Sequence, residues 1–157
     1  MSKPFIAVLA ALAAISMIVA GCGGGDDSSS DSSSITKAQF IKQADEICEK
    51  GNEENEAEFE EFAEDQGLSE GEEPTKAQQD EAITEIVAPG VRKQIEEIDA
   101  LPVPEGDEKQ IEAIVLSVEE GVVEIETNPD TLSAGISPLA EGSKLAKDYG
   151  LKACGEE

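Results

Sequence analysis

Histidine and tryptophan are absent from this sequence, and basic residues are scarce, with 11 Lys and Arg against 36 Asp and Glu. Without histidine the chain lacks the commonest general base of enzymes and the nitrogen ligands of zinc sites. A single tyrosine leaves little aromatic surface for stacking sugar rings, which disfavours a carbohydrate role without excluding it. The net charge of −25 repels phosphate backbones, so ordinary nucleic-acid binding is excluded and a monomer is favoured.

Catalytic and cofactor motifs are also missing. No stretch fits an EF-hand loop, a phosphate loop or a dinucleotide-binding glycine pattern. The residues Gly67-Leu68-Ser69-Glu70-Gly71 match the hydrolase pattern G-x-S-x-G. However, that pattern needs a preceding strand and a histidine base, and an acidic helical segment comes before it here. We therefore expect a loop there, no cofactor and no enzymatic activity. One alternative stays open, a carboxylate-dependent enzyme acting on envelope glycans.

The N-terminus reads as a secretory signal. Lys3 precedes an apolar run from residue 5 to residue 20 that only Ser16 interrupts. As a helix this run spans roughly 24 Å, which is short for a bilayer core of about 30 Å. The residues Val19-Ala20-Gly21-Cys22 at its end resemble the bacterial lipobox. The resemblance implies that residues 1–21 are cleaved and that Cys22 carries a diacylglyceryl anchor.

Residues 22–34 contain Cys22 followed only by Gly, Asp and Ser, a composition that predicts a flexible tether. Removing residues 1–21 removes a single charge, that of Lys3, so the mature chain has 10 basic and 36 acidic residues and a net charge of −26. Such a surface repels anionic headgroups, so the lipid must provide the attachment. We expect a protein that is lipid-anchored on the extracytoplasmic face of the cell membrane.

The 123 residues from 35 to 157 suffice for one small domain, and their apolar spacing predicts an all-α bundle of four to five helices. Thr36 with Gln39, and Thr75 with Gln78, have the spacing of capping boxes that begin helices. Pro89 and Gly90 are expected to break or kink the helix that follows Thr75.

Two further helices follow. One starts near Asp107, carries the longest apolar stripe of the chain, and ends at Asn128 and Pro129. Adjacent β-branched residues leave a strand at 122–125 as the competing interpretation. The last helix is expected to have Ser137 as its cap and Pro138 as its first residue, and to end at Gly150 in a left-handed conformation.

Besides Cys22 the chain has two cysteines, Cys48 and Cys154. Outside the cytoplasm disulfides persist, so a bridge, if one forms, joins these two residues; the alternative is a pair of buried free thiols. Two regions of the chain resemble a group of small exported lipoproteins of actinobacteria whose function is uncharacterised. These regions are Phe40 to Cys48 and residues 138–155, the latter reading Pro138-Leu139-Ala140 through Tyr149-Gly150-Leu151 to Cys154-Gly155. The resemblance implies a helical domain closed by a disulfide and transfers no catalytic or ligand residues.

An acidic run fills residues 53–64. Like charges four residues apart repel one another, so we expect this end of its helix to fray or bend. The main interpretation is a solvated helix face. The alternative is weak divalent-cation binding, for which Glu54, Glu58 and Glu61 are the candidates because they share one helix surface. Taken together, these features predict a non-catalytic binding or accessory module whose partner is an envelope protein or polymer.

Overall fold

The described part of the chain is built from helices and contains no strand. The computed structural model describes residues 35–69 and 71–155, all of which belong to one unit of the chain, residues 32–157. The expected signal peptide, Cys22 and the tether up to Ser34 lie outside the described residues. In its described residues the unit has four long helical segments and one short helix, which confirms the predicted all-α domain of four to five helices.

Helix α1 (Lys37–Asp65) begins at the predicted capping box. The Thr36 hydroxyl accepts a hydrogen bond from the backbone N–H of Gln39, and the Gln39 side chain accepts one from the backbone N–H of Thr36. The helix then continues through the acidic run as far as Asp65, so the expected fraying is not seen. Ion pairs of Glu54 with Lys50 (3.3 Å) and with Lys93 of α3 (2.6 Å) offset part of the repulsion.

The second long segment joins α2 (Lys76–Ala82), the π-helical turn η1 (Ile83–Val87) and α3 (Ala88–Asp99) without a gap. The predicted capping box at Thr75 begins it. The helix does not break at Pro89, which has no N–H to donate to the carbonyl four residues earlier. Just before the proline the Ala88 N–H donates to the Ile83 carbonyl five residues earlier, so the π turn changes the hydrogen-bond register.

Helix α4 (Glu108–Thr127) is helical throughout, so the strand interpretation of residues 122–125 is wrong. The apolar stripe that favoured a helix is buried along α4, where it meets α3 and α6. The short helix α5 (Asp130–Ser133) follows and was not predicted.

Helix α6 (Ala140–Tyr149) starts two residues after the expected position. The N-cap is Leu139 and not Ser137, no side chain accepts a capping hydrogen bond, and Pro138 lies in a turn before the helix. A Cβ on Gly121 of α4 would lie 2.6 Å from the Pro138 carbonyl oxygen, so packing against α4 holds this turn in place. The helix ends as predicted at Gly150, whose φ is 115°, and the 3-10 turn η2 (Ala153–Gly155) closes the described chain.

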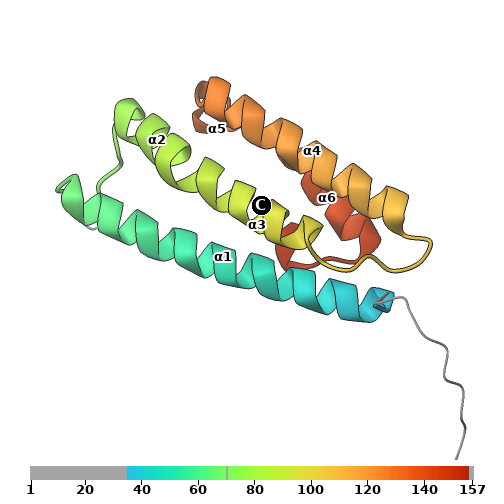
Figure 1. The fold of residues 1–157 in the computed structure, drawn as a ribbon. Helices are drawn as coiled ribbons and strands as arrows, with labels where there is room; N and C mark the ends of the chain where they lie inside the picture. The colour runs from blue at the N-terminus through green and yellow to red at the C-terminus, as the bar shows by residue number, and fades with distance from the viewer. Residues whose placement is uncertain (1–34, 70, 156–157) are drawn as a thin grey trace, which may run out of the picture. The chain divides into compact units, whose positions relative to one another are not determined.

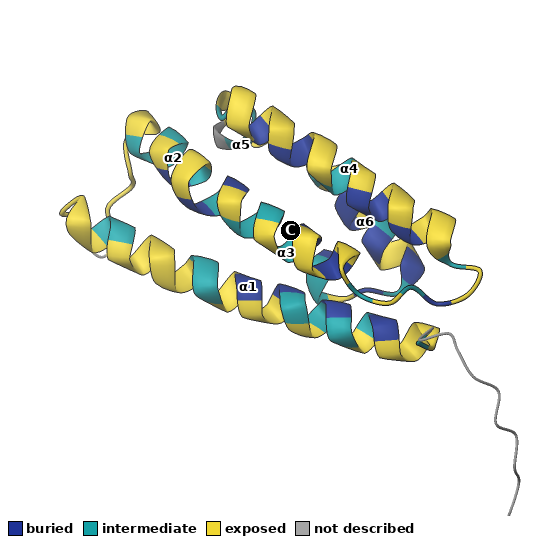
Figure 2. Cartoon of the chain, in the orientation of Figure 1, coloured by how far each residue is buried: buried dark blue, intermediate teal, exposed yellow. Residues whose placement is uncertain are grey.

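Within this unit α1, the α2–η1–α3 segment and α4 follow one another side by side, and α6 packs on α4 behind them (Figure 1). The buried residues line the inner faces of these helices, and the outer faces are exposed (Figure 2). Phe40 and Tyr149 meet edge to face with ring centroids 5.9 Å apart. They belong to the main core, which also contains Ala44, Cys48, Ile95, Ile98, Ile111, Ile114, Val115, Ala146 and Leu151.

The predicted disulfide is confirmed, since Cys48 of α1 is bonded to Cys154 of η2 with their α-carbons 5.2 Å apart. Beside it the carboxylate of Asp45 accepts hydrogen bonds from the backbone N–H groups of Lys152 (2.8 Å) and Ala153 (2.9 Å). The end of the chain is thus attached to the middle of α1 by one covalent bond and two hydrogen bonds. Across the described ranges, no helix combines the length and the apolarity that crossing a membrane requires.

Candidate functional site

An apolar groove with a volume of about 420 Å³ lies between the C-terminal half of α1 and α2. We call it the α1–α2 groove. Its volume falls within the range of roughly 300–1,000 Å³ that is typical of ligand sites. It is lined by Phe59, Phe62, Ala63, Leu68, Pro74, Gln78, Gln79, Ala82, Ile83 and Leu132.

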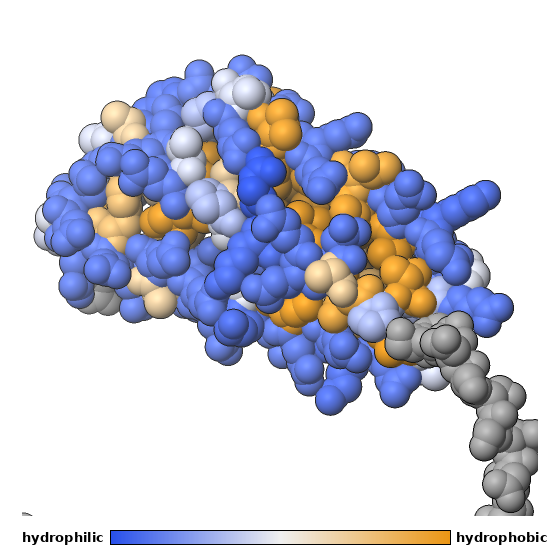
Figure 3. All heavy atoms as spheres, viewed as in Figure 1, coloured by the Kyte–Doolittle hydropathy of each residue, from blue (hydrophilic) through white to orange (hydrophobic). Residues whose placement is uncertain are grey.

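The groove exists because α2 does not pack on the end of α1. Helix α1 contacts η1 and α3, whereas α2 contacts α5. The apolar side chains that two packed helices would bury against each other therefore remain accessible. Phe59 is 39% exposed, and Phe62, Leu68, Ile83 and Leu132 are half-buried. In Figure 3 this end of the unit shows apolar atoms in a hollow surrounded by hydrophilic side chains.

The loop between α1 and α2 holds the groove open at its end. Gly67 has a φ of 69°, and the Leu68 N–H returns to the Ala63 carbonyl (2.9 Å), which folds Leu68 back toward α1. Two amides tie the rim together. Gln78 Nε2 donates to Gln66 Oε1 (3.3 Å), and Gln79 Nε2 donates to the Pro74 carbonyl (3.1 Å). The loop contains the Gly67–Gly71 pattern, which follows a helix and not the strand that a hydrolase nucleophile requires.

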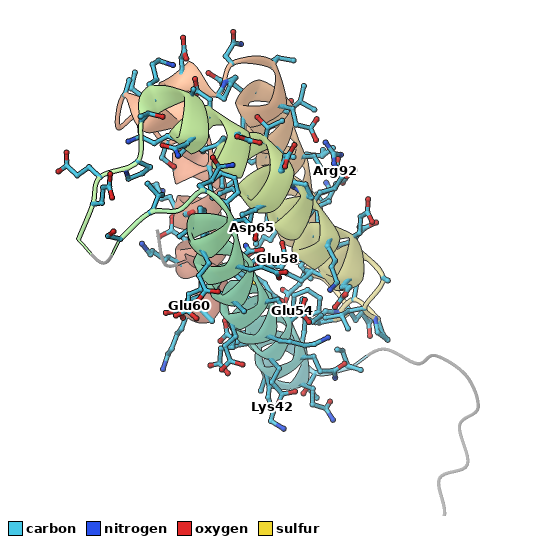
Figure 4. The ribbon with its side chains drawn as sticks, turned by 90° about the vertical axis from the view of Figure 1, so that its left-hand side faces the viewer. Lys42, Glu54, Glu58, Glu60, Asp65 and Arg92 are labelled. Atoms are coloured by element: carbon cyan, nitrogen blue, oxygen red, sulfur yellow. A yellow bond between two sulfur atoms is a disulfide. The ribbon has the colours of Figure 1, made fainter. Side chains whose placement is uncertain are left out.

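The surroundings of the groove are strongly acidic. Residues 53–81 contain 13 acidic residues and one basic residue, Lys76. The Lys76 ammonium is bound by Asp130 and by Asp80 (2.7 Å), and these hydrogen bonds, that of Asp130 first, raise its pKa. Figure 4 shows Glu54 and Glu58 on the side of α1 that faces α3, and Glu60 on the other side. The groove therefore combines an apolar lining with acidic surrounding segments.

A second, smaller hollow of about 120 Å³ lies between α1 and α3 and is polar. The two helices approach closely there because Gly51 faces the Gln94 side chain and Gly90 faces the Asn55 side chain. Gln94 Nε2 is buried without a hydrogen-bond partner among the described residues. At this size the hollow is too small for most ligands.

Two of the candidate cation ligands, Glu54 and Glu58, line this hollow, and Glu54 forms ion pairs with Lys50 and Lys93. The ammonium of Lys93, and then that of Lys50, lower the pKa of Glu54. No set of three or more acidic, Cys or His side chains in residues 35–69 and 71–155 is placed to hold a metal ion, and this includes Glu54 with Glu58 and Glu61.

Acid–base catalysis by carboxyl groups would need one of them to have a raised pKa. The carboxyl groups with a shifted pKa in the described chain are Glu54 and Glu108, and both pKa values are lowered. For Glu108 the main cause is a hydrogen bond from the backbone N–H of Gly106 (3.1 Å). Neither residue thus has the property expected of a general acid at neutral pH.

The structure therefore unites one pair of the residues singled out in the sequence, Cys48 and Cys154, and Cys22 lies outside the described residues. The α1–α2 groove was missed. Its one sequence signal was Phe59 and Phe62 within the acidic run, two aromatic residues that a purely solvated helix face does not need.

Comparisons with protein-family models, with curated proteins and with solved structures each found no match for this chain.

Proposed function

We propose that this protein is a lipid-anchored, extracytoplasmic binding module of the cell envelope, and that the α1–α2 groove is its binding site. The lipobox-like residues Val19–Cys22, and the Gly/Asp/Ser-rich segment after them, support the anchoring. The observation that carries the binding role is the groove itself, which offers apolar side chains from α1, the following loop, α2, η1 and α5 in a hollow of about 420 Å³.

The anchor is tested with Cys22→Ser. This variant removes the thiol that would receive the diacylglyceryl group, so we expect an unprocessed precursor or a released domain. Detergent partitioning and mass spectrometry of the N-terminus measure both. Unchanged membrane retention with an unmodified N-terminus contradicts the anchor.

The groove is tested with a neutral apolar fluorescent probe, N-phenyl-1-naphthylamine, which the acidic surface does not repel. The chain has no tryptophan, so Phe62→Trp places a unique reporter in the groove. The protein used is the chain from residue 22 with Cys22→Ser, which needs no detergent that could compete for the groove. We expect saturable energy transfer from the tryptophan of this variant to the probe.

The matched control is Leu116→Trp on α4, because Leu116 is a 50% exposed apolar residue outside the groove. We expect less transfer at saturation from this variant, because its tryptophan lies outside the groove. A second variant, Ala63→Trp, fills the groove from α1 and should weaken probe binding. Equal transfer at saturation from the Phe62→Trp and Leu116→Trp variants, or no saturable binding by either, contradicts the groove as a binding site.

A further inference from the structure

We infer that the occupant of the α1–α2 groove is a basic amphipathic helical segment of another envelope protein. This inference rests on the proposed function and specifies its partner. Two properties of the groove carry it, the extent of its apolar lining along the helices and the sign of the charge around it.

The apolar lining extends for about the length that one turn of an incoming helix would cover. On α1 it runs from Phe59 to Ala63, which is roughly 6 Å along the axis at 1.5 Å per residue, and on the facing side Ala82 and Ile83 contribute apolar surface. Apolar side chains at i and i+3 or i+4 of a partner helix are spaced by a similar length. Helix α2 leaves this side of α1 uncovered, so the partner helix takes the place of a neighbouring helix.

The charge around the groove selects the sign of the partner. Residues 53–81 have a net charge of −12, because Lys76 is the only base among their 13 acidic residues. Glu56 and Glu60, which flank Phe59 in α1, are exposed, and Glu60 lies on the side of α1 that faces away from α3 (Figure 4). These carboxylates repel a fatty acid, an anionic lipid and a second copy of this acidic chain, and they attract lysine or arginine.

The basic residues near the groove do not neutralise this field. The Lys76 ammonium is shared by Asp80 and Asp130, and Lys93 binds Glu54 (2.6 Å) at the neighbouring hollow. Glu56 and Glu60 are in none of the ion pairs found among the described residues. A partner that brings its own positive charges is therefore complementary to the groove in both its apolar and its charged parts.

The test uses a capped helical peptide of about 14 residues with leucines at i, i+3, i+4 and i+7 and lysines elsewhere. Its matched control carries glutamates in place of the lysines. Calorimetry with the chain from residue 22, carrying Cys22→Ser, measures the affinity. We expect the lysine peptide to bind and to displace N-phenyl-1-naphthylamine, and the glutamate peptide to do neither. Binding should weaken about tenfold from 0.15 M to 1 M salt, because the Debye length shortens from about 8 Å to about 3 Å.

A charge-reversed variant, Glu56→Lys with Glu60→Lys, should bind the lysine peptide about fivefold or more weakly and the neutral probe unchanged. Its control, matched in charge, is Glu112→Lys with Glu120→Lys on α4, two exposed residues outside the groove, and it should leave both affinities unchanged. An equal loss for this control overturns the inference, because the attraction would then come from the net charge alone.

Failure of the inference can be distinguished from failure of the proposed function. Probe binding without peptide displacement overturns the helical partner and leaves the groove as a binding site. Displacement by dodecyltrimethylammonium but not by the lysine peptide assigns the groove to a small cationic amphiphile and also overturns the helical partner. Absence of probe binding contradicts the proposed function and this inference together.

Discussion

Removal of the Cys48–Cys154 disulfide by Cys48→Ala with Cys154→Ala should cost a large part of the stability of this domain. The two cysteines are separated by 106 residues, so the bridge closes nearly the whole domain into one loop. In the chain-entropy model a loop of this length stabilises the folded state by about 4.8 kcal/mol at 25 °C. Typical domains have only about 5–15 kcal/mol of stability in total.

The expected change in melting temperature follows from the size of the domain. With an unfolding entropy of about 2.1 cal/mol/K per residue, the residues between Ile35 and Gly155 give roughly 250 cal/mol/K, so the loss corresponds to about 20 °C. The folded structure itself should survive, because Asp45 still accepts the hydrogen bonds from Lys152 and Ala153. Far-ultraviolet circular dichroism at low temperature should therefore be unchanged.

Thermal melts with and without reductant provide the assay and its control. Reductant should lower the melting temperature of the wild-type chain to about that of the double variant, and it should leave the variant unchanged. A difference of less than about 5 °C between oxidised wild type and variant would refute the loop-entropy argument. Reductant sensitivity of the variant would show that the measured loss does not come from this bridge.

Three further outcomes are expected. Gly121→Ala places a methyl group 2.6 Å from the Pro138 carbonyl oxygen; overpacking should outweigh the gain in helix propensity, and denaturant titration should show a net loss of about 1–2 kcal/mol. Burial, and then the hydrogen bond to Asp107, raise the pKa of Tyr149, so the folded state favours the protonated phenol. The free energy of unfolding should therefore fall above about pH 10, and Tyr149→Phe should flatten that decline. An unchanged pH profile of stability in this variant contradicts the assignment. If the run around Glu54 is a solvated face, sodium, magnesium and calcium should raise the melting temperature equally at matched ionic strength, and a rise specific to calcium would instead support the cation-binding alternative.

The features that sequence analysis predicted correctly depend on interactions within one or two helical turns. The capping boxes at Thr36 and Thr75 and the left-handed cap at Gly150 involve residues at most a few positions apart. Their chemistry is therefore visible in the sequence itself. The disulfide was predictable for a different reason, because two cysteines outside the lipobox allow only one pairing.

The structure differs from the local expectation where other contacts change it. The helix does not break at Pro89, because the π turn at Ile83–Val87 changes the hydrogen-bond register before it, and the helix packs on α1 through Gly90 and Asn55. The turn at Pro138 displaced the predicted start of α6 because its carbonyl packs against Gly121, which lies 17 residues away in the sequence.

The α1–α2 groove could be found only in the tertiary structure. Periodicity identifies Phe59 and Phe62 as an apolar edge of α1, but it does not say whether another helix covers that edge. The answer depends on the distance between α1 and α2, which is set by the packing of α3 on α1 and by the contact of α2 with α5. Leu132 of α5, which lies 70 residues after Phe62 in the sequence, completes the lining of the groove. The sequence by itself thus determined where the long helices lie and which face of each is apolar, because hydrogen bonding and capping act locally. The tertiary structure decided which apolar face remains open, because that is a property of the spaces between helices.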